Sequence, residues 1–279
     1  PGTDGDVILP AVSVTSDDDL TINSTGTVDF TGTVNLGTGN LDVSIDTDND
    51  GTVTAVVDQS ITAGSIDFTA GGVSGGDTLD VNQNLAAGTS LTIDNVQTIA
   101  VAQDVDLSAA GGDLSATTNV GSITLDGTAG ENEFKTTGGS GDIALGAIGN
   151  SGTASDLIVT TAAATSSGDV TLNGAVTGVG YVTVNAGSTA SGNTGDVAIN
   201  ANVTAGAANG TKGIDIDATN DVTIAGTLTT TDGVGVDIDI DAANEFTLTS
   251  GGFDSDDDVF ITAVADDVNL AVNLEADGL

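Results

Sequence analysis

The 279-residue chain has no cysteine, histidine, methionine, tryptophan or arginine, and its only basic side chains are Lys135 and Lys212. The absence of cysteine excludes a disulfide framework. Without histidine or cysteine the chain lacks the usual general base, thiol nucleophile and soft metal ligands, so we do not expect an enzyme. Two lysines cannot form a basic patch that neutralises phosphates, so we expect neither a nucleic-acid partner nor binding to an anionic membrane surface.

Proline and long apolar runs are also scarce. Proline occurs only at Pro1 and Pro10, so nothing after residue 10 forbids continuous β-ladder bonding. No apolar run approaches the length of a membrane-spanning helix, so we expect no direct insertion into a membrane. The chain starts at Pro1 without a charged, apolar leader, which is typical of a processed product or an excised fragment.

Acidic and aliphatic residues dominate the composition of the chain. The 41 acidic residues give a formal net charge of -39, yet 38% of the chain is hydrophobic, mostly Val, Ile, Leu and Ala. The apolar residues alternate with Asp, Thr, Ser and Asn, which is typical of half-buried strands and not of a disordered acidic polymer. Because such a charge repels itself, we expect the fold to need screening by salt or bound divalent cations.

A drifting internal repeat indicates the architecture. Residues 214–225 read IDIDATNDVTIA, and residues 238–249, 24 positions on, read IDIDAANEFTLT. A looser copy, FITAVADDVNL at 260–270, follows at an offset of 22, with Phe260, Val264, Val268 and Leu270 at the apolar positions. A period in the twenties is typical of a solenoid, whose units bury their apolar faces only by stacking.

Acidic residues mark the expected strand starts, and they recur at intervals in the twenties that shorten toward the C-terminus. These starts are Asp142, Asp169, Asp196, Asp221, Glu245 and Asp267. A second strand lies between most of them, so we predict about two strands per coil, joined at Gly-, Asn- and Ser-rich corners. The sequence therefore predicts an all-β parallel β-helix of roughly 22–27 residues per coil and ~12 coils, with an antiparallel sandwich as the structural alternative. We expect one continuous domain over 1–279, with 1–18 as an extended N-terminal assembly or capping segment.

Alternation assigns the faces of the repeated strand. It places Ile214, Ile216, Ile238 and Ile240 inward. It places Asp215, Asp217, Asp239 and Asp241 outward, so that Asp215 stacks on Asp239 and Asp217 on Asp241. Stacked like charges are destabilising unless something lies between them, and carboxylates suit Ca²⁺. We therefore predict structural Ca²⁺ at these four aspartates, with a merely solvated acidic face as the alternative.

A second candidate metal site is a local motif. Residues 46–51 read DTDNDG, which matches the D-x-D-x-D-G start of a calcium loop. The expected closing glutamate is replaced by Val57, with Asp58 one place later. We predict Asp46, Asp48, Asp50 and Asp58 as ligands, with a simple acidic turn as the alternative. The fragment GGDTL at 75–79 also resembles, as an isolated copy, the nonapeptide of calcium-binding β-rolls.

The two ends are candidate assembly surfaces. An uncapped solenoid exposes unpaired backbone groups and part of its core. We predict that the ends pair with other copies of the chain, head to tail or by strand addition, or else form the first and last coils of a monomer. The candidate residues are Val7, Ile8, Leu9, Val12 and Val14 at one end, and Val268, Leu270, Val272 and Leu274 at the other.

Several segments share one sequence pattern, a G-D-V-T-L/I strand followed by a Gly/Asn turn. Examples are GDVTLNGAVTG at 168–178 and GDVAINANVTAG at 195–206. These runs resemble the repeats of filamentous-haemagglutinin-type adhesins and autotransporter passenger domains. The resemblance implies secretion, a right-handed parallel β-helix and a role in adhesion or surface assembly.

Together these features favour an extracellular structural protein. We expect a secreted or cell-surface, self-assembling acidic solenoid subunit of a filament, sheath or matrix, stabilised by Ca²⁺ or salt. The alternative is an adhesin segment that binds a surface glycan or ice through a flat Thr/Asp face. Paired carboxylates could also hydrolyse glycosides, but the chain has few of the basic and aromatic residues that usually accompany such a site.

Overall fold

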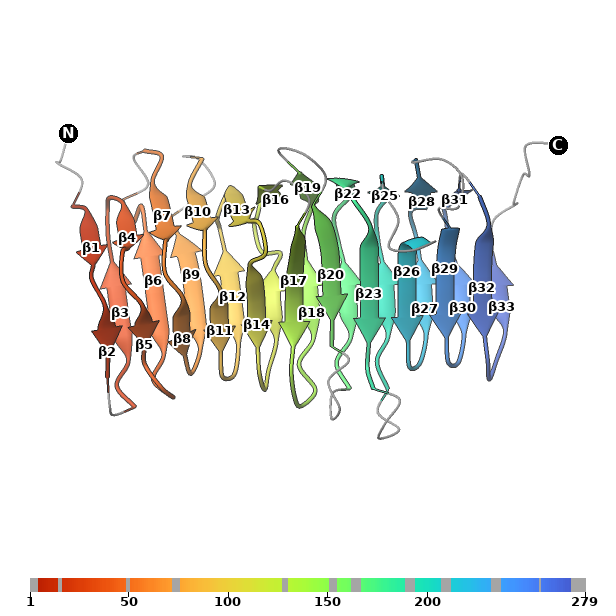
Figure 1. The fold of residues 1–279 in the computed structure, drawn as a ribbon, viewed down its shortest axis with the longest axis horizontal. Coiled ribbons are helices and arrows are strands. Elements are labelled where there is room, and N and C mark those ends of the chain that lie inside the picture. The colour runs from red at the N-terminus through yellow and green to blue at the C-terminus, as the bar shows by residue number, and fades with distance from the viewer. Residues whose placement is uncertain are drawn as a thin grey trace.

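The computed structural model describes residues 5–14, 17–48, 51–71, 76–126, 130–150, 155–161, 167–188, 194–206, 212–231, 237–255 and 257–271. These residues form an elongated stack of β-coils with the first and last strands, β1 (Val7–Leu9) and β33 (Val268–Leu270), at opposite ends (Figure 1). They contain strands and no helix, and each coil adds one strand to each of three 11-stranded parallel sheets. The predicted parallel β-solenoid is therefore confirmed.

The three sheets, here named A, B and C, take every third strand in chain order. Sheet A consists of β1 (Val7–Leu9), β4 (Val28–Phe30), β7 (Thr54–Val57), β10 (Thr78–Val81), β13 (Thr98–Ala102), β16 (Ser122–Asp126), β19 (Ile148–Asn150), β22 (Val176–Val179), β25 (Val203–Ala205), β28 (Thr227–Thr230) and β31 (Gly252–Asp254). Sheet B consists of β2 (Val12–Ser13), β5 (Val34–Asn35), β8 (Ile61–Ala63), β11 (Leu85–Ala87), β14 (Asp106–Ala109), β17 (Glu131–Thr136), β20 (Asp156–Thr160), β23 (Val182–Ala186), β26 (Lys212–Ala218), β29 (Asp237–Ala242) and β32 (Val259–Ala263). Sheet C consists of β3 (Leu20–Asn23), β6 (Leu41–Ile45), β9 (Ile66–Ala70), β12 (Leu91–Asp94), β15 (Leu114–Ala116), β18 (Ile143–Leu145), β21 (Val170–Leu172), β24 (Val197–Ile199), β27 (Val222–Ile224), β30 (Phe246–Leu248) and β33 (Val268–Leu270).

The core follows from the two-residue alternation of the strands. In β26 and β29 the isoleucines at 214, 216, 238 and 240 are buried, while the aspartates between them face outward. The buried aliphatic residues form one continuous cluster from Leu9 in the first coil to Leu248 in the coil before the last. Each coil is too small to enclose a core alone, so this cluster exists only because the coils stack.

Each coil contains three strands where the sequence predicted two. The strands that the prediction missed lie mostly in sheet A, such as β22 and β25. Such strands lack the acidic residue that directly precedes each sheet C strand from β18 on, so nothing marks their start in the sequence. With 11 coils at ~4.8 Å per strand, the stack is ~50 Å long.

The repeat length varies more than the sequence predicted, in both directions. Leu79 pairs with Ile99 across a coil shorter than the predicted range, whereas Val182 pairs with Ile214 across a coil longer than it. The strands nevertheless keep inward residues stacked on inward residues. The corners therefore take up the differences in length, and the sheets keep their register.

The third copy of the repeat is shifted by one residue from the predicted alignment. Val259 pairs with Ile238, and Phe260 pairs with Asp239. Phe260 is therefore an outward residue that is 49% exposed, and Val264 is 76% exposed. The predicted apolar roles of Phe260 and Val264 are wrong, because a one-residue slip moves a side chain to the other face. The predicted offset does hold in sheet C, where Val268 pairs with Phe246.

Glycine is required where corners of successive coils stack closely. Gly251 has a φ of 82°, and a Cβ at this position would lie 2.1 Å from the carbonyl oxygen of Gly226. Only glycine combines a positive φ with this approach of one backbone to the next. The glycine-rich corners thus permit the tight stacking that the strands need.

Candidate functional site

The acidic residues that begin the sheet C strands form a hydrogen-bonded ladder along the solenoid. The Oδ1 atom of Asp142 accepts the backbone N–H of Asp169 at 2.9 Å, and that of Asp169 accepts the N–H of Asp196 at 2.8 Å. Asp196 accepts from Asp221 and Asp221 from Glu245, each at 3.1 Å. Each carboxylate thus fixes the start of the next coil through a charge-assisted hydrogen bond.

Asparagine side chains support this ladder. Asn220 Nδ2 donates to Asp196 Oδ1 at 2.7 Å, and Asn244 Nδ2 donates to Asp221 Oδ1 at 2.6 Å. Burial raises the pKa of Asp169, and the charges of its two ladder neighbours raise it further, against the lowering effect of the backbone hydrogen bond. The hydrogen bonds of the ladder therefore stabilise the stack, while the like charges of its carboxylates repel one another.

The outward aspartates of β26 and β29 stack as the repeat predicts. Asp215 pairs with Asp239, and Asp217 pairs with Asp241. Lys212 Nζ lies between the first two, 2.8 Å from Asp215 Oδ1 and 2.8 Å from Asp239 Oδ2. An ammonium therefore occupies the position between these carboxylates for which the sequence indicated Ca²⁺. Burial opposes the charge of Lys212, but hydrogen bonds to both aspartates raise its pKa overall.

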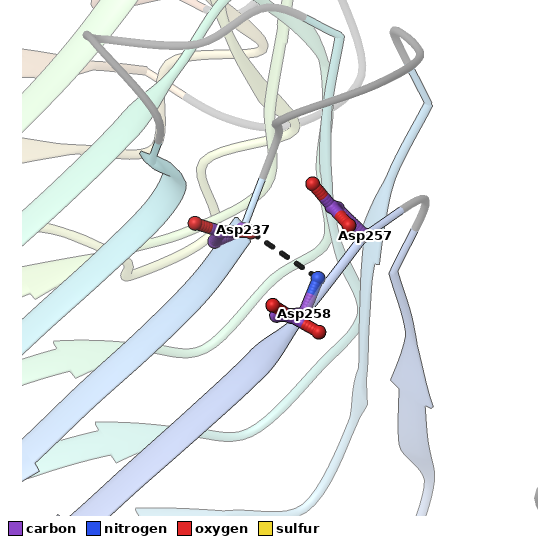
Figure 2. Close-up of side chains that lie close together, drawn as sticks. All are labelled: Asp237, Asp257 and Asp258. Atoms are coloured by element: carbon purple, nitrogen blue, oxygen red, sulfur yellow. Dashed lines mark hydrogen bonds between the residues drawn. The ribbon is translucent and has the colours of Figure 1, made fainter.

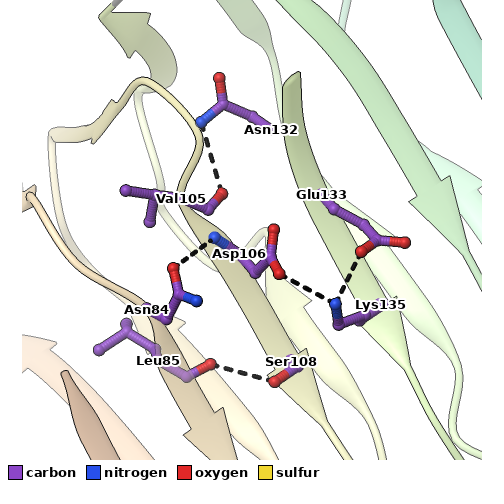
Figure 3. Close-up of polar contacts among 8 residues, drawn as sticks. All are labelled: Asn84, Leu85, Val105, Asp106, Ser108, Asn132, Glu133 and Lys135. Carbon is purple, nitrogen blue, oxygen red and sulfur yellow. Dashed lines mark hydrogen bonds and ion pairs between the residues drawn. The ribbon is translucent and has the colours of Figure 1, made fainter. Parts of the chain in front are cut away.

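Lys135 bridges two coils in the same way. Its Nζ lies 3.0 Å from Asp106 Oδ2 on β14 and 2.7 Å from Glu133 Oε2 on β17 (Figure 3). Sequence reasoning gave neither lysine a role, because only the register shows which acidic residues lie above and below it. Both lysines of the chain are thus bound to carboxylates of the same chain.

The second stacked pair, Asp217 and Asp241, lies in a groove of about 540 Å³ along sheet B. Neither lysine of the described residues forms an ion pair with these two carboxylates. Burial, followed by the charge of Asp215, raises the pKa of Asp217 to about 6, although Lys212 opposes the shift. The other lining residues are polar or small and apolar: Asn185, Ala186, Gly187, Ser188, Ala218, Thr219, Ala242, Ala243, Thr262 and Val264.

The residues of the D-x-D-x-D-G motif are not all brought together. Asp46 is fully buried with a φ of 48°, whereas Asp48 is exposed. Asp50 lies outside the described residues. Asp58 follows β7, which separates it from the motif by ~13 Å of strand, and its Oδ1 accepts a hydrogen bond from Asn82 Nδ2 at 3.1 Å.

One acidic cluster has the spacing of a metal site. Carboxylate oxygens of Asp237, Asp257 and Asp258 lie within 4.8 Å of one another (Figure 2). Asp237 Oδ1 also accepts the backbone N–H of Asp258 at 3.2 Å. Asp257 and Asp258 belong to an acidic run at 254–258 of the sequence, but only the register of β29 and β32 adds Asp237. Because Asp257 and Asp258 are exposed, solvent competes fully for this site.

The predicted assembly residues that the structure describes lie in the outermost coils. At the N-terminal end, Val7, Val12 and Val14 pack partly buried against the core, Leu9 is buried, and Ile8 is 68% exposed. At the C-terminal end, Val268 and Leu270 lie above Phe246 and Leu248 but are themselves exposed. Val272 and Leu274 lie outside the described residues. Residues 7–9 and 12–13 form strands of the first coil.

No family model, curated protein or solved structure matches the chain. The structure confirms the parallel β-solenoid that the resemblance to adhesin repeats implied. The described part of the chain has no helix capable of crossing a membrane.

Proposed function

We propose that this protein is a structural β-solenoid that assembles end to end. The observation that carries the proposal is the exposed apolar side chains of the last described coil. Among the described residues, its strands β31, β32 and β33 pair on one side only. Val268 and Leu270 continue the inward columns of sheet C, yet they stand exposed. Such an edge is a ready template for another β-chain.

The other end offers a complementary surface. There β1, β2 and β3 also have a partner on one side only among the described strands. A C-terminal coil stacked on an N-terminal coil would continue three parallel sheets without a change of direction. Because the two surfaces differ, this contact is heterologous and produces an open filament.

The surface charge favours growth along the axis over lateral clumping. The net charge of -39 makes the sides of neighbouring rods repel, and salt or divalent cations reduce that repulsion. We therefore propose a filament, sheath or matrix subunit at the cell surface or in the extracellular space, stabilised by Ca²⁺ or salt. The support for this location is the resemblance to exported adhesin repeats together with the acidic composition.

Negative-stain electron microscopy tests the proposal, with the purified chain in millimolar calcium and again in excess chelator. We expect long regular filaments that loosen on chelation. Leu270→Asp places a charge on the end face and should give isolated rods. The matched control, Thr62→Asp, adds the same charge at an exposed position of the third coil, away from both end faces, and should leave filaments intact. Isolated rods of the unmodified chain in both conditions would contradict assembly.

The groove favours a second candidate, an adhesin segment that binds a surface glycan. Asp217, Asp241, Asn185 and Thr262 form one outward row across four strands, which offers acceptors and donors to sugar hydroxyls. The hollowed shape suits a glycan better than ice, which requires a flat face. A monomeric rod that binds glycans, and loses them when Asp241 is replaced by Ala, would favour this function over assembly.

A further inference from the structure

Two fully buried aspartates lie in successive corners near one end of the stack. Asp46 follows β6, and Asp77 precedes β10, one coil further on. The charge of Asp46 acts on Asp77 and, after the larger effect of burial, raises its pKa. The two carboxylates therefore interact inside the protein, where neither side chain is exposed.

The carboxylate of Asp77 points in an unusual direction. Its Oδ1 accepts the N–H of Val53 at 2.9 Å, and Val53 belongs to the preceding coil. Ladder aspartates such as Asp169 instead accept from the following coil, as with Asp196 at 2.8 Å. The Asp77 carboxylate is thus turned back toward the corner that begins at Asp46.

The second oxygen of Asp77 has no partner in this position. Asp77 Oδ2 is buried and accepts no hydrogen bond from any described residue. The two lysines of the chain are bound elsewhere, to Asp106 and Glu133 and to Asp215 and Asp239. Burying an ionised carboxylate without a counter-charge is very costly, and two adjacent ones cost more.

We propose that Asp77 and Asp46 bind one calcium ion between successive corners, with Asp77 Oδ2 as the ligand that closes the site. A hard divalent cation supplies the missing charge and coordinates carboxylate oxygens directly. Asp77 thus takes the closing role for which the sequence offered Asp58. Asp46, from the start of the acidic motif, and Asp77, from the GGDTL fragment, thus belong to one site that joins adjacent coils.

This inference depends on the cation-binding part of the proposed function and not on assembly. The two proposals can fail separately. A variant that forms filaments but is no longer stabilised by calcium would affect only the calcium site, and a chain that calcium stabilises but that forms no filaments would contradict only assembly.

Thermal unfolding in chelator and in calcium tests the site, with Asp77→Asn as the variant. Asn keeps an oxygen that accepts the Val53 N–H, so the fold is retained. In chelator the variant should melt above the unmodified chain, because one buried charge is gone. In calcium the unmodified chain should gain several degrees that the variant does not gain. Equilibrium dialysis should show one fewer tightly bound calcium per chain.

Two further variants keep the test decisive. Asp46→Asn should lose the same calcium ion, whereas Asp58→Asn, a matched loss of one carboxylate, should retain it. An equal rise of melting temperature with calcium in the unmodified chain and in Asp77→Asn would overturn the proposal. So would an advantage of Asp77→Asn that is as large in calcium as in chelator, since calcium would then not neutralise the buried carboxylates.

Discussion

Asp169 accepts the backbone N–H of Asp196, one coil further along the stack, at 2.8 Å. The same pairing recurs between successive acidic strand starts in sheet C, from Asp142 to Glu245. An acidic residue at this position thus acts twice, because it begins its own strand and fixes the start of the next. Its hydrogen bond stabilises the stack, while its charge repels its neighbours.

Replacing Asp169 separates these two effects. Asp169→Ala leaves the Asp196 N–H without its acceptor and should lower the free energy of unfolding by about 1 kcal/mol. Asp169→Asn keeps the Oδ1 acceptor and removes a charge that burial and neighbouring carboxylates disfavour, so it should be neutral or stabilising at low salt. Urea unfolding followed by circular dichroism measures both. Equal destabilisation by the two variants would contradict the ladder.

Asp217 should make stability depend on pH. Its pKa is raised from 3.8 to about 6 in the folded chain, so the folded state binds this proton more tightly than the unfolded state does. Stability from this group is therefore greatest at low pH and falls as pH rises from about 4 to about 6. Asp217→Asn should melt above the unmodified chain at pH 7, and the difference should shrink toward pH 5. Melting curves across this range check the trend, with Asp58→Asn as the control for loss of one exposed charge.

Lys212 should contribute by screening the paired aspartates of β26 and β29. Lys212→Gln removes the ammonium between Asp215 and Asp239 and should destabilise the chain by about 1 kcal/mol, since the group is partly exposed. The loss should be larger at low ionic strength, because salt screens the remaining repulsion. Lys212→Arg keeps the charge and serves as the matched control. An effect of Lys212→Gln that does not change with salt would indicate lost packing.

The near-identical repeat predicted its own part of the structure well. Ile214 stacks on Ile238 and Asp215 on Asp239, as the repeat offset predicted. This works because two long strands with strict alternation leave one register that buries all their isoleucines. The fold class follows from the same pattern, since coils with matching inward residues must stack.

Other features depend on contacts that the order of residues does not contain. The missed strands of sheet A have no acidic residue before them, unlike the equally short sheet C strands from β18 on. The change in corner length before Val259 reversed the predicted faces of the last sheet B strand, including Phe260. The charges of Asp77 and Asp46 act on each other because the corners that hold them belong to coils stacked one on the next. A local motif such as D-x-D-x-D-G shows which side chains a corner contains, but not which residue of the next coil lies against them.

All three sheets direct their backbone hydrogen bonds along the long axis of the rod (Figure 1). Tension between the two ends would therefore load the junctions between coils in series, and at each junction the three sheets would share the load. The breaking force of such a rod is set by its least well-paired junction and not by its length. Adding coils would make the rod longer and more extensible without making it stronger.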